Sequence, residues 1–203
     1  MRSCFVALVA LLFWGNFSVL AQFDPRFPDG FDTPTSHRIS LTDKEKVFVV
    51  PEGKNFYLTR LTTLAPSLMS SSASLDVNGV GILSFNRGSE LCGVSADQYF
   101  VTPLILKGGD KVTLTGKGEA YLQGFTVESK ITPVILDSDQ AFELPKGKTF
   151  VLLHTIKNRE CEIAYKSKFA FTEIDALHFP EFFSTQESIE KLDKSGVRLG
   201  YIY

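Results

Sequence analysis

The densest group of side chains that could do chemistry lies in the last quarter of the chain and comprises Glu173, Asp175, His178 and Glu181. Glu173 and Asp175 are two residues apart, so they share one face if the strand that we expect over 162–171 extends through Ile174. Two carboxyl groups at a suitable separation can act as the acid and the base of a glycosidase. Glu173, Asp175 and Glu181 are therefore the candidate catalytic residues of a small extracellular hydrolase. The competing interpretation is a solvated strand end followed by a loop.

Other catalytic and cofactor-binding patterns do not occur in the sequence. The histidines His37, His154 and His178 are scattered, and none has a partner at the spacing of a zinc site. There is no Gly-x-Ser-x-Gly elbow of the kind that carries a nucleophilic serine. The glycine pairs at 79–81 and 116–118 lack the strand-loop-helix setting that aims backbone N–H groups at a phosphate. The sequence predicts neither a metal ion nor a cofactor.

The first 21 residues have the pattern of a secretory signal peptide. Arg2 precedes an apolar run over 5–13, and Ala21 supplies the small residue at the cleavage position. The run is too short to span a bilayer, and no later stretch of the sequence is long enough. We therefore expect a secreted protein, periplasmic or extracellular, that is cleaved near Ala21.

The charge balance bears on the class of partner. Lys and Arg total 21 and Asp and Glu total 23, which gives a net charge of −2, and the sequence has no basic block. A nucleic-acid partner therefore has no electrostatic support. We expect instead a protein or a polysaccharide at the cell surface.

Two cysteines remain once Cys4 has left with the signal peptide. Cys92 and Cys161 form an even pair in an exported chain, and this predicts a disulfide. The alternative is a pair of buried free thiols. The bond would connect the two repeat units described next.

One short phrase occurs twice, as Val50-Pro51-Glu52-Gly53-Lys54 and again as Leu144-Pro145-Lys146-Gly147-Lys148. Each copy is typical of a strand, a Pro-x-Gly turn and a second strand, in which Pro presets φ and Gly accepts a positive φ. The copies align at an offset of 94 residues through further identities, Phe48/Phe142, Phe56/Phe150 and Leu58/Leu152. This predicts two related β units, and the alternative is two unrelated strands that share a turn.

Together with Gly124-Phe125 and Gly200-Tyr201, these turns give the chain a family resemblance. It resembles secreted bacterial proteins built on β-sandwich repeats, which have a Val-Pro-x-Gly-Lys turn and a closing Gly-Tyr or Gly-Phe strand. The resemblance covers only these phrases. It implies an architecture, names no activity and transfers no functional residues.

Most of the chain has the pattern of short strands. Asn78-Gly79 between two apolar runs predicts a hairpin with a type I′ turn. Alternation over 111–115 indicates a sheet with one wet face. A helix is expected over 185–194, capped by Ser184 with Glu187 three residues on. We predict an all-β protein, an antiparallel β-sandwich of two tandem related units, 38–130 and a shorter 131–203, with one short helix near the C-terminus.

The segment 22–37 is predicted to be an extended arm, because its prolines oppose helix and sheet. Burying Phe23, Phe27 and Phe31 yields about 2–3 kcal/mol each. Ordering ten residues costs about 1–2 kcal/mol per residue. We therefore expect the arm to be weakly held on its own protein and to dock through these phenylalanines on a partner. The alternative is a flexible tether with incidental phenylalanines.

These observations lead to one interpretation with two alternatives. The first is a secreted, non-catalytic β-sandwich protein that serves as an adhesion, surface or ligand-binding module. The second is the hydrolase with its acidic cluster. The third is a subunit that docks to a surface assembly through the aromatic arm.

Overall fold

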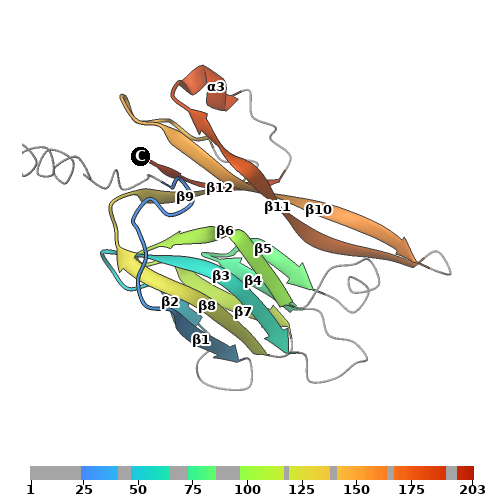
Figure 1. Cartoon of the computed structure of the whole chain (residues 1–203). Helices are drawn as coiled ribbons and strands as arrows, with labels where there is room; N and C mark the ends of the chain where they lie inside the picture. The colour runs from blue at the N-terminus through green and yellow to red at the C-terminus, as the bar shows by residue number, and fades with distance from the viewer. Residues whose placement is uncertain are drawn as a thin grey trace, which may run out of the picture.

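The computed structural model describes residues 24–40, 47–64, 73–85, 97–116, 119–137, 141–163, 167–190 and 196–203. These residues form three antiparallel sheets of four strands each and one short helix, which confirms the all-β class (Figure 1). In the described part of the chain, no helix has the length and apolar character needed to cross a bilayer.

Two of the sheets form a sandwich. Sheet A has the order β1 (Thr35–Ser40), β8 (Glu119–Glu128), β3 (Lys54–Leu64), β6 (Asp97–Lys107). Sheet B has the order β2 (Val47–Val49), β7 (Lys111–Gly116), β4 (Ala73–Val77), β5 (Val80–Phe85). Alternate residues of both sheets meet in one buried cluster, for example Leu58 and Leu122 of sheet A with Leu75 and Val112 of sheet B. The period of two that the sequence showed therefore separates a core face from a solvent face.

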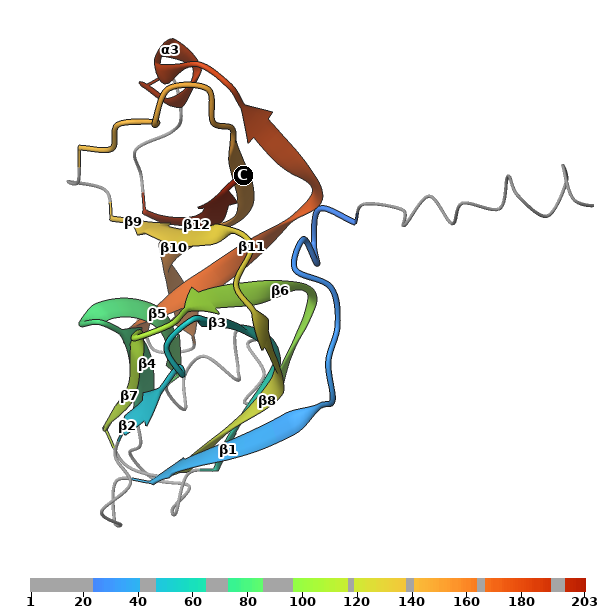
Figure 2. The same cartoon turned by 90° about the vertical axis from the view of Figure 1, so that its left-hand side faces the viewer.

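The third sheet packs against one end of this sandwich (Figures 1 and 2). Sheet C has the order β9 (Thr132–Leu136), β12 (Val197–Ile202), β10 (Phe150–Ile163), β11 (Ser167–Phe183). The helix α3 (Gln186–Glu190) follows β11 and buries Ile189. Thr185 caps this helix, since its Oγ1 accepts a hydrogen bond from the Ser188 N–H at 3.2 Å, so the expected cap at Ser184 is wrong by one residue.

Sheets A and C correspond strand for strand. If the four strands of each sheet are numbered along the chain, both sheets have the spatial order first, last, second, third. In both sheets the second strand has a register shift, between Leu58 and Arg60 in β3 and between Leu152 and His154 in β10. Gly124 lies opposite Leu58 and Gly200 opposite Leu152. The offset of 94 residues therefore relates β3 to β10, whereas Gly124 and Gly200 of the closing strands are 76 residues apart.

The paired turns have the expected geometry, but the strand expected before the second turn is wrong, because residues 141–144 belong to no strand. Gly53 has φ 74° and Gly147 has φ 77°, and in each turn a lysine N–H donates back to the proline carbonyl, at 3.2 Å from Lys54 and 3.0 Å from Lys148. Asn78 and Gly79 also have positive φ, as a type I′ hairpin requires.

The second unit differs from the expectation of a shorter sandwich. Within the described residues the second unit forms no second sheet of its own against sheet C. One side of sheet C is covered by Phe142, Leu144 and Ile189, and the other packs on sheet A of the first unit. The reason lies in connection length, because residues 65–96 separate β3 from β6 and carry β4 and β5, whereas only residues 164–166 separate β10 from β11.

The two units share buried clusters. Tyr57 and Phe125 of sheet A pack with Val151, Leu153 and Tyr201 of sheet C in one cluster. The sandwich core in turn includes Ile156 and Leu199 of sheet C. Residues 38–130 and 131–203 are therefore joined by packing as well as by the chain.

Candidate functional site

The predicted acidic cluster is spread along one strand. Glu173, Asp175 and Glu181 all belong to β11, opposite Lys157, Thr155 and Leu152 respectively. Their partners on β10, Lys157 for Glu173 and Leu152 for Glu181, are five residues apart, which corresponds to roughly 17 Å along the sheet. A glycosidase needs its two carboxyl groups about 5–10 Å apart. The strand therefore does not bring Glu181 to the other two, and catalysis by Glu173 and Asp175, whose side chains are outside the described structure, stays a prediction.

Other predicted site residues lie partly outside the described residues. Cys92 and Phe23 fall in undescribed segments, and of Cys161 only the backbone is described, in β10 opposite Phe169. The disulfide stays a prediction. Among the described side chains no group of three or more could hold a metal ion.

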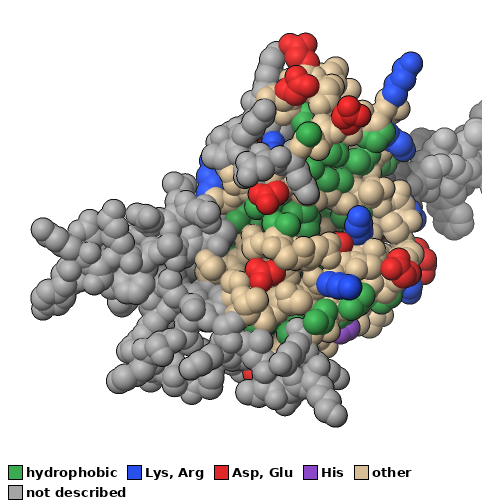
Figure 3. All heavy atoms as spheres, turned by 180° about the vertical axis from the view of Figure 1, so that it is seen from behind, with side chains coloured by type: hydrophobic (Ala, Val, Ile, Leu, Met, Phe, Trp, Pro, Cys, Tyr) green, Lys and Arg blue, Asp and Glu red, His purple; other side chains and the backbone are tan. Residues whose placement is uncertain are grey.

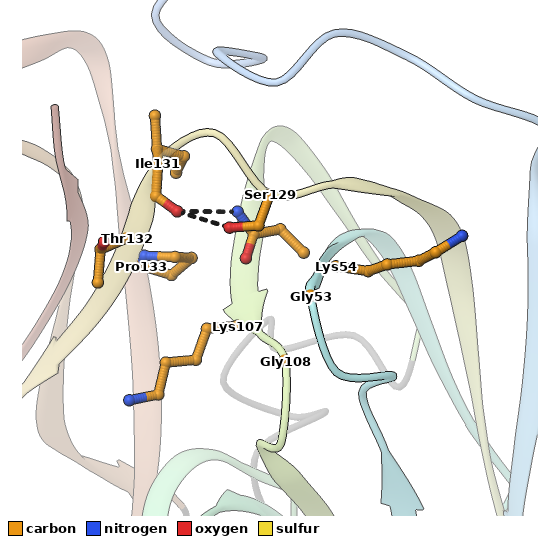
Figure 4. A pocket seen from close by; sticks show the side chains of 9 residues that line it. Gly53, Lys54, Lys107, Gly108, Ser129, Ile131, Thr132 and Pro133 are labelled. Carbon is orange, nitrogen blue, oxygen red and sulfur yellow. Dashed lines mark hydrogen bonds between the residues drawn. The ribbon is translucent and has the colours of Figure 1, made fainter.

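A recess lies where β3, the end of β6 and the connection from β8 to β9 meet. It has a volume of about 190 Å³ and is lined by Gly53, Lys54, Asn55, Lys107, Gly108, Ser129, Ile131, Thr132 and Pro133. Figure 4 shows Lys54 and Lys107 extending away from each other, and the Ser129 hydroxyl bonding to the Ile131 carbonyl at 2.9 Å. Small-molecule sites usually enclose about 300–1,000 Å³. This recess is too small, and its lysines too divergent, for a site of that kind.

The aromatic arm lies on its own protein, which corrects the expectation of a weakly held segment. Figure 2 shows residues 24–34 running from β1 toward sheet C. The Phe27 ring lies 6.1 Å from the rings of Tyr57 and Phe125, and the Tyr201 hydroxyl donates to the Pro25 carbonyl at 2.8 Å. The Phe31 ring contacts the Phe27 ring in a tilted arrangement, with 4.4 Å between their centroids, but Phe31 is 70% exposed.

A buried carboxylate supplies the interaction that the sequence argument lacked. Asp29 is 5% exposed and accepts hydrogen bonds from Asn55 Nδ2 at 2.7 Å, the Tyr57 hydroxyl at 2.8 Å, and the backbone N–H groups of Lys130 at 2.7 Å and Ile131 at 3.2 Å. Burial, together with the hydrogen bond to Asp29, raises the pKa of Tyr57, so its hydroxyl stays a donor. The free energy of holding the arm, as expected from the sequence, included only the burial of the phenylalanines. The hydrogen bonds to Asp29 add the stabilisation that offsets the entropy of ordering the arm.

The part of sheet A beyond the arm presents an open outer surface. We call it the tyrosine–arginine face and define it by Arg38, Arg60, Thr62, Asp97, Tyr99, Glu119, Tyr121 and Gln123. In the strand register, Arg60 of β3 lies opposite Gln123 of β8 and opposite Tyr99 of β6. In the next row, Tyr121 of β8 lies opposite Arg38 of β1 and Thr62 of β3. The alternate residues Leu61, Ala120 and Leu122 are buried in the sandwich core. The face is therefore a sheet surface whose side chains project outward from a rigid base.

Two ion pairs hold the arginines in place. Arg60 donates from Nε at 2.8 Å and from Nη2 at 2.6 Å to the two Asp97 oxygens, and the Thr62 hydroxyl bonds the same carboxylate at 2.9 Å. Arg38 donates from Nε to Glu119 at 3.1 Å and from Nη2 to its other oxygen, and the Tyr121 hydroxyl bonds Glu119 at 3.1 Å.

These hydrogen bonds set the charge state of the face. The bond from Arg60 lowers the pKa of Asp97, and the bond from Arg38 lowers the pKa of Glu119, so both carboxyl groups are ionised at neutral pH. The Arg60 guanidinium also lies 4.5 Å from the Tyr99 ring centroid, and that ring is 61% exposed. Bidentate pairs of this kind fix both partners in one geometry.

Sequence reasoning missed this face. The alternation of apolar and polar residues in Ala120-Tyr121-Leu122-Gln123 does indicate a strand with one solvent-exposed side. The partners, however, are set by strand register, and the register shift beside Arg60 could not be read from the sequence.

The fold and this face define an all-β protein with a preorganised polar and aromatic sheet surface. No protein-family model matches the chain, and no curated relative matches it. Among solved structures it is similar to dimeric latent PorU from Porphyromonas gingivalis, with 10% identity and a TM-score of 0.22, over 89% of this chain and 19% of that one. A similarity at this level carries no argument about fold or function.

Proposed function

We propose that the protein is a secreted, non-catalytic β-sandwich module that attaches to a partner at the cell surface through the tyrosine–arginine face. The observation that supports this most is the immobilised surface itself. Arg60 and Arg38 are each held by a bidentate carboxylate, so little side-chain freedom is lost when a ligand binds. Tyr99 is the large exposed side chain at its edge, and tyrosine and arginine are the residues that most often dominate binding energy.

Export is part of the proposal. The basic residue, apolar run and small residue that end at Ala21 support cleavage there, which would leave a mature chain beginning at Gln22. In an oxidising compartment Cys92 and Cys161 would pair.

We also propose that the two units arose by duplication. Sheets A and C have the same register shift, the same Pro-x-Gly turn and a glycine opposite the shift, Gly124 in one and Gly200 in the other, and these features support a common origin. The phenylalanine pairs agree with this, since Phe48 and Phe56 lie 5.1 Å apart and Phe142 and Phe150 lie 5.5 Å apart.

The proposal is tested by measuring how tightly the mature protein binds to cell envelopes and to glycan and protein arrays. Tyr99→Ala removes the exposed ring, and Val49→Ala serves as a matched control, because Val49 is 49% exposed on sheet B. We expect at least a tenfold loss of binding for Tyr99→Ala and none for Val49→Ala. Equal binding by wild type and Tyr99→Ala would overturn the assignment of this face.

A further inference from the structure

The charge arrangement of the tyrosine–arginine face restricts what can bind there. Each arginine is matched by a carboxylate, Arg60 by Asp97 and Arg38 by Glu119, so the pairs carry no net charge. Figure 3 shows the side of the molecule opposite to Figure 1, where acidic and basic side chains of the described residues are scattered and form no patch of one sign. A polyanion would meet a carboxylate beside every guanidinium. The face therefore favours an uncharged ligand.

The remaining hydrogen-bonding capacity indicates the chemistry of that ligand. A guanidinium has five N–H donors, and Arg60 uses Nε and Nη2 on Asp97, which leaves Nη1 for a ligand. Beside it on β8, the half-buried Gln123 presents an amide with both a donor and an acceptor. Vicinal hydroxyl groups, each of which donates and accepts, match this mixture.

The third element is the aromatic ring. Tyr99 is the neighbour of Arg60 on the opposite side from Gln123, so amide, guanidinium and ring form one row across β8, β3 and β6. Adjacent strands lie about 4.8 Å apart, so the row spans roughly 10 Å. A pyranose has an apolar C–H face and polar edges, and tyrosine offers rigid amphipathic area at a low entropic cost.

From this row we infer that the ligand is a neutral polysaccharide. One of its sugar rings stacks on the face of Tyr99 that Arg60 does not cover, and hydroxyl groups of this and the neighbouring sugar bond Arg60 and Gln123. This inference rests on the proposed binding function. A protein partner is less well matched, because a protein interface needs a desolvated apolar centre, and the described side chains of the row offer only one tyrosine ring.

The inference is tested by affinity electrophoresis of the mature protein in gels that contain xylan, galactomannan, β-1,3-glucan or pullulan, with alginate as the polyanion. We expect retardation by at least one neutral polymer, unchanged between 50 and 500 mM salt, since no counterions are released (~0 salt slope). Tyr99→Ala should weaken binding at least tenfold, whereas Tyr99→Phe, which keeps the ring, should stay within about threefold. Gln123→Ala gives a second variant that leaves the ring and both ion pairs in place.

The outcomes separate this inference from the function on which it rests. Retardation by alginate alone, or neutral-polymer binding that Tyr99→Ala and Gln123→Ala leave unchanged, would overturn the polysaccharide assignment. If no polymer retards the protein while Tyr99→Ala still abolishes attachment to envelopes, the ligand class is wrong and the binding face stands. If Tyr99→Ala leaves envelope attachment unchanged, the proposed function itself fails.

Discussion

Replacing Asp29 by alanine should detach the arm from both units. The carboxylate accepts four hydrogen bonds, from the side chains of Asn55 and Tyr57 and from the backbone of Lys130 and Ile131. All but Lys130 are buried residues, so the substitution leaves donors without a partner where water has little access.

The magnitude follows from the number and kind of bonds. A hydrogen bond to a charged group contributes about 1.5–3 kcal/mol, and such contributions are not additive within one network. Part of the loss is recovered because the arm can leave and let water reach the donors. We therefore expect Asp29→Ala to lower the free energy of unfolding by about 3–5 kcal/mol, within the range for a broken buried network.

Urea denaturation of the mature protein measures this loss, and amide hydrogen exchange at Lys130 and Ile131 locates it. Asp32→Ala is the control, because exposed Asp32 bonds only the adjacent Thr33 N–H among the described residues, and it should change stability by less than about 0.5 kcal/mol.

A double-mutant cycle sharpens the test. If Asp29 and Tyr57 act through one bond, Asp29→Ala and Tyr57→Phe together should cost less than the sum of the two single changes, by about 1 kcal/mol or more. A loss below about 1 kcal/mol for Asp29→Ala, or full additivity in the cycle, would refute the anchor.

Two further perturbations test the fold. Burial lowers the pKa of His154 to about 4, so only the unfolded chain takes up a proton as the pH falls below about 6.5. Relative to His154→Gln, the free energy of unfolding of wild type should fall by about 1 kcal/mol between pH 7 and pH 5.5 and by about 2 kcal/mol between pH 7 and pH 4.5; parallel stability curves would contradict this. Gly53→Ala and Gly147→Ala should each cost about 1 kcal/mol, since φ is positive but no atom crowds the added Cβ. In Gly124→Ala and Gly200→Ala the Cβ would overlap a carbonyl oxygen of the neighbouring strand, so we expect about 3 kcal/mol or more, and thermal melts in which all four glycine variants match would refute the distinction.

Local features of this chain could be predicted from its sequence because their causes are local. The positive φ at Gly53 and Gly147, and the Asn78-Gly79 turn, follow from the steric freedom of the residues themselves. The all-β class follows from period-two alternation between such turns.

Features that depend on long-range register could not be predicted in this way. Arg60 pairs with Asp97 across 37 residues, and Arg38 with Glu119 across 81, through registers that a bulge can shift. Asp29, in a stretch rich in proline and glycine, had the pattern of an ordinary turn residue, and only the fold brings it to Ile131, 102 positions later. The acidic cluster shows the converse, because neighbours in sequence on an extended strand move steadily apart in space.

The shared burial of the two units has a consequence for inheritance. Tyr57 and Phe125 from the first unit share one buried cluster with Val151 and Tyr201 from the second, so a break near residue 130 would expose apolar surface on both pieces. We therefore expect that neither half would serve as an independent cassette in another protein, although each has its own sheet. On this expectation, recombination preserves the two units when it transfers them together.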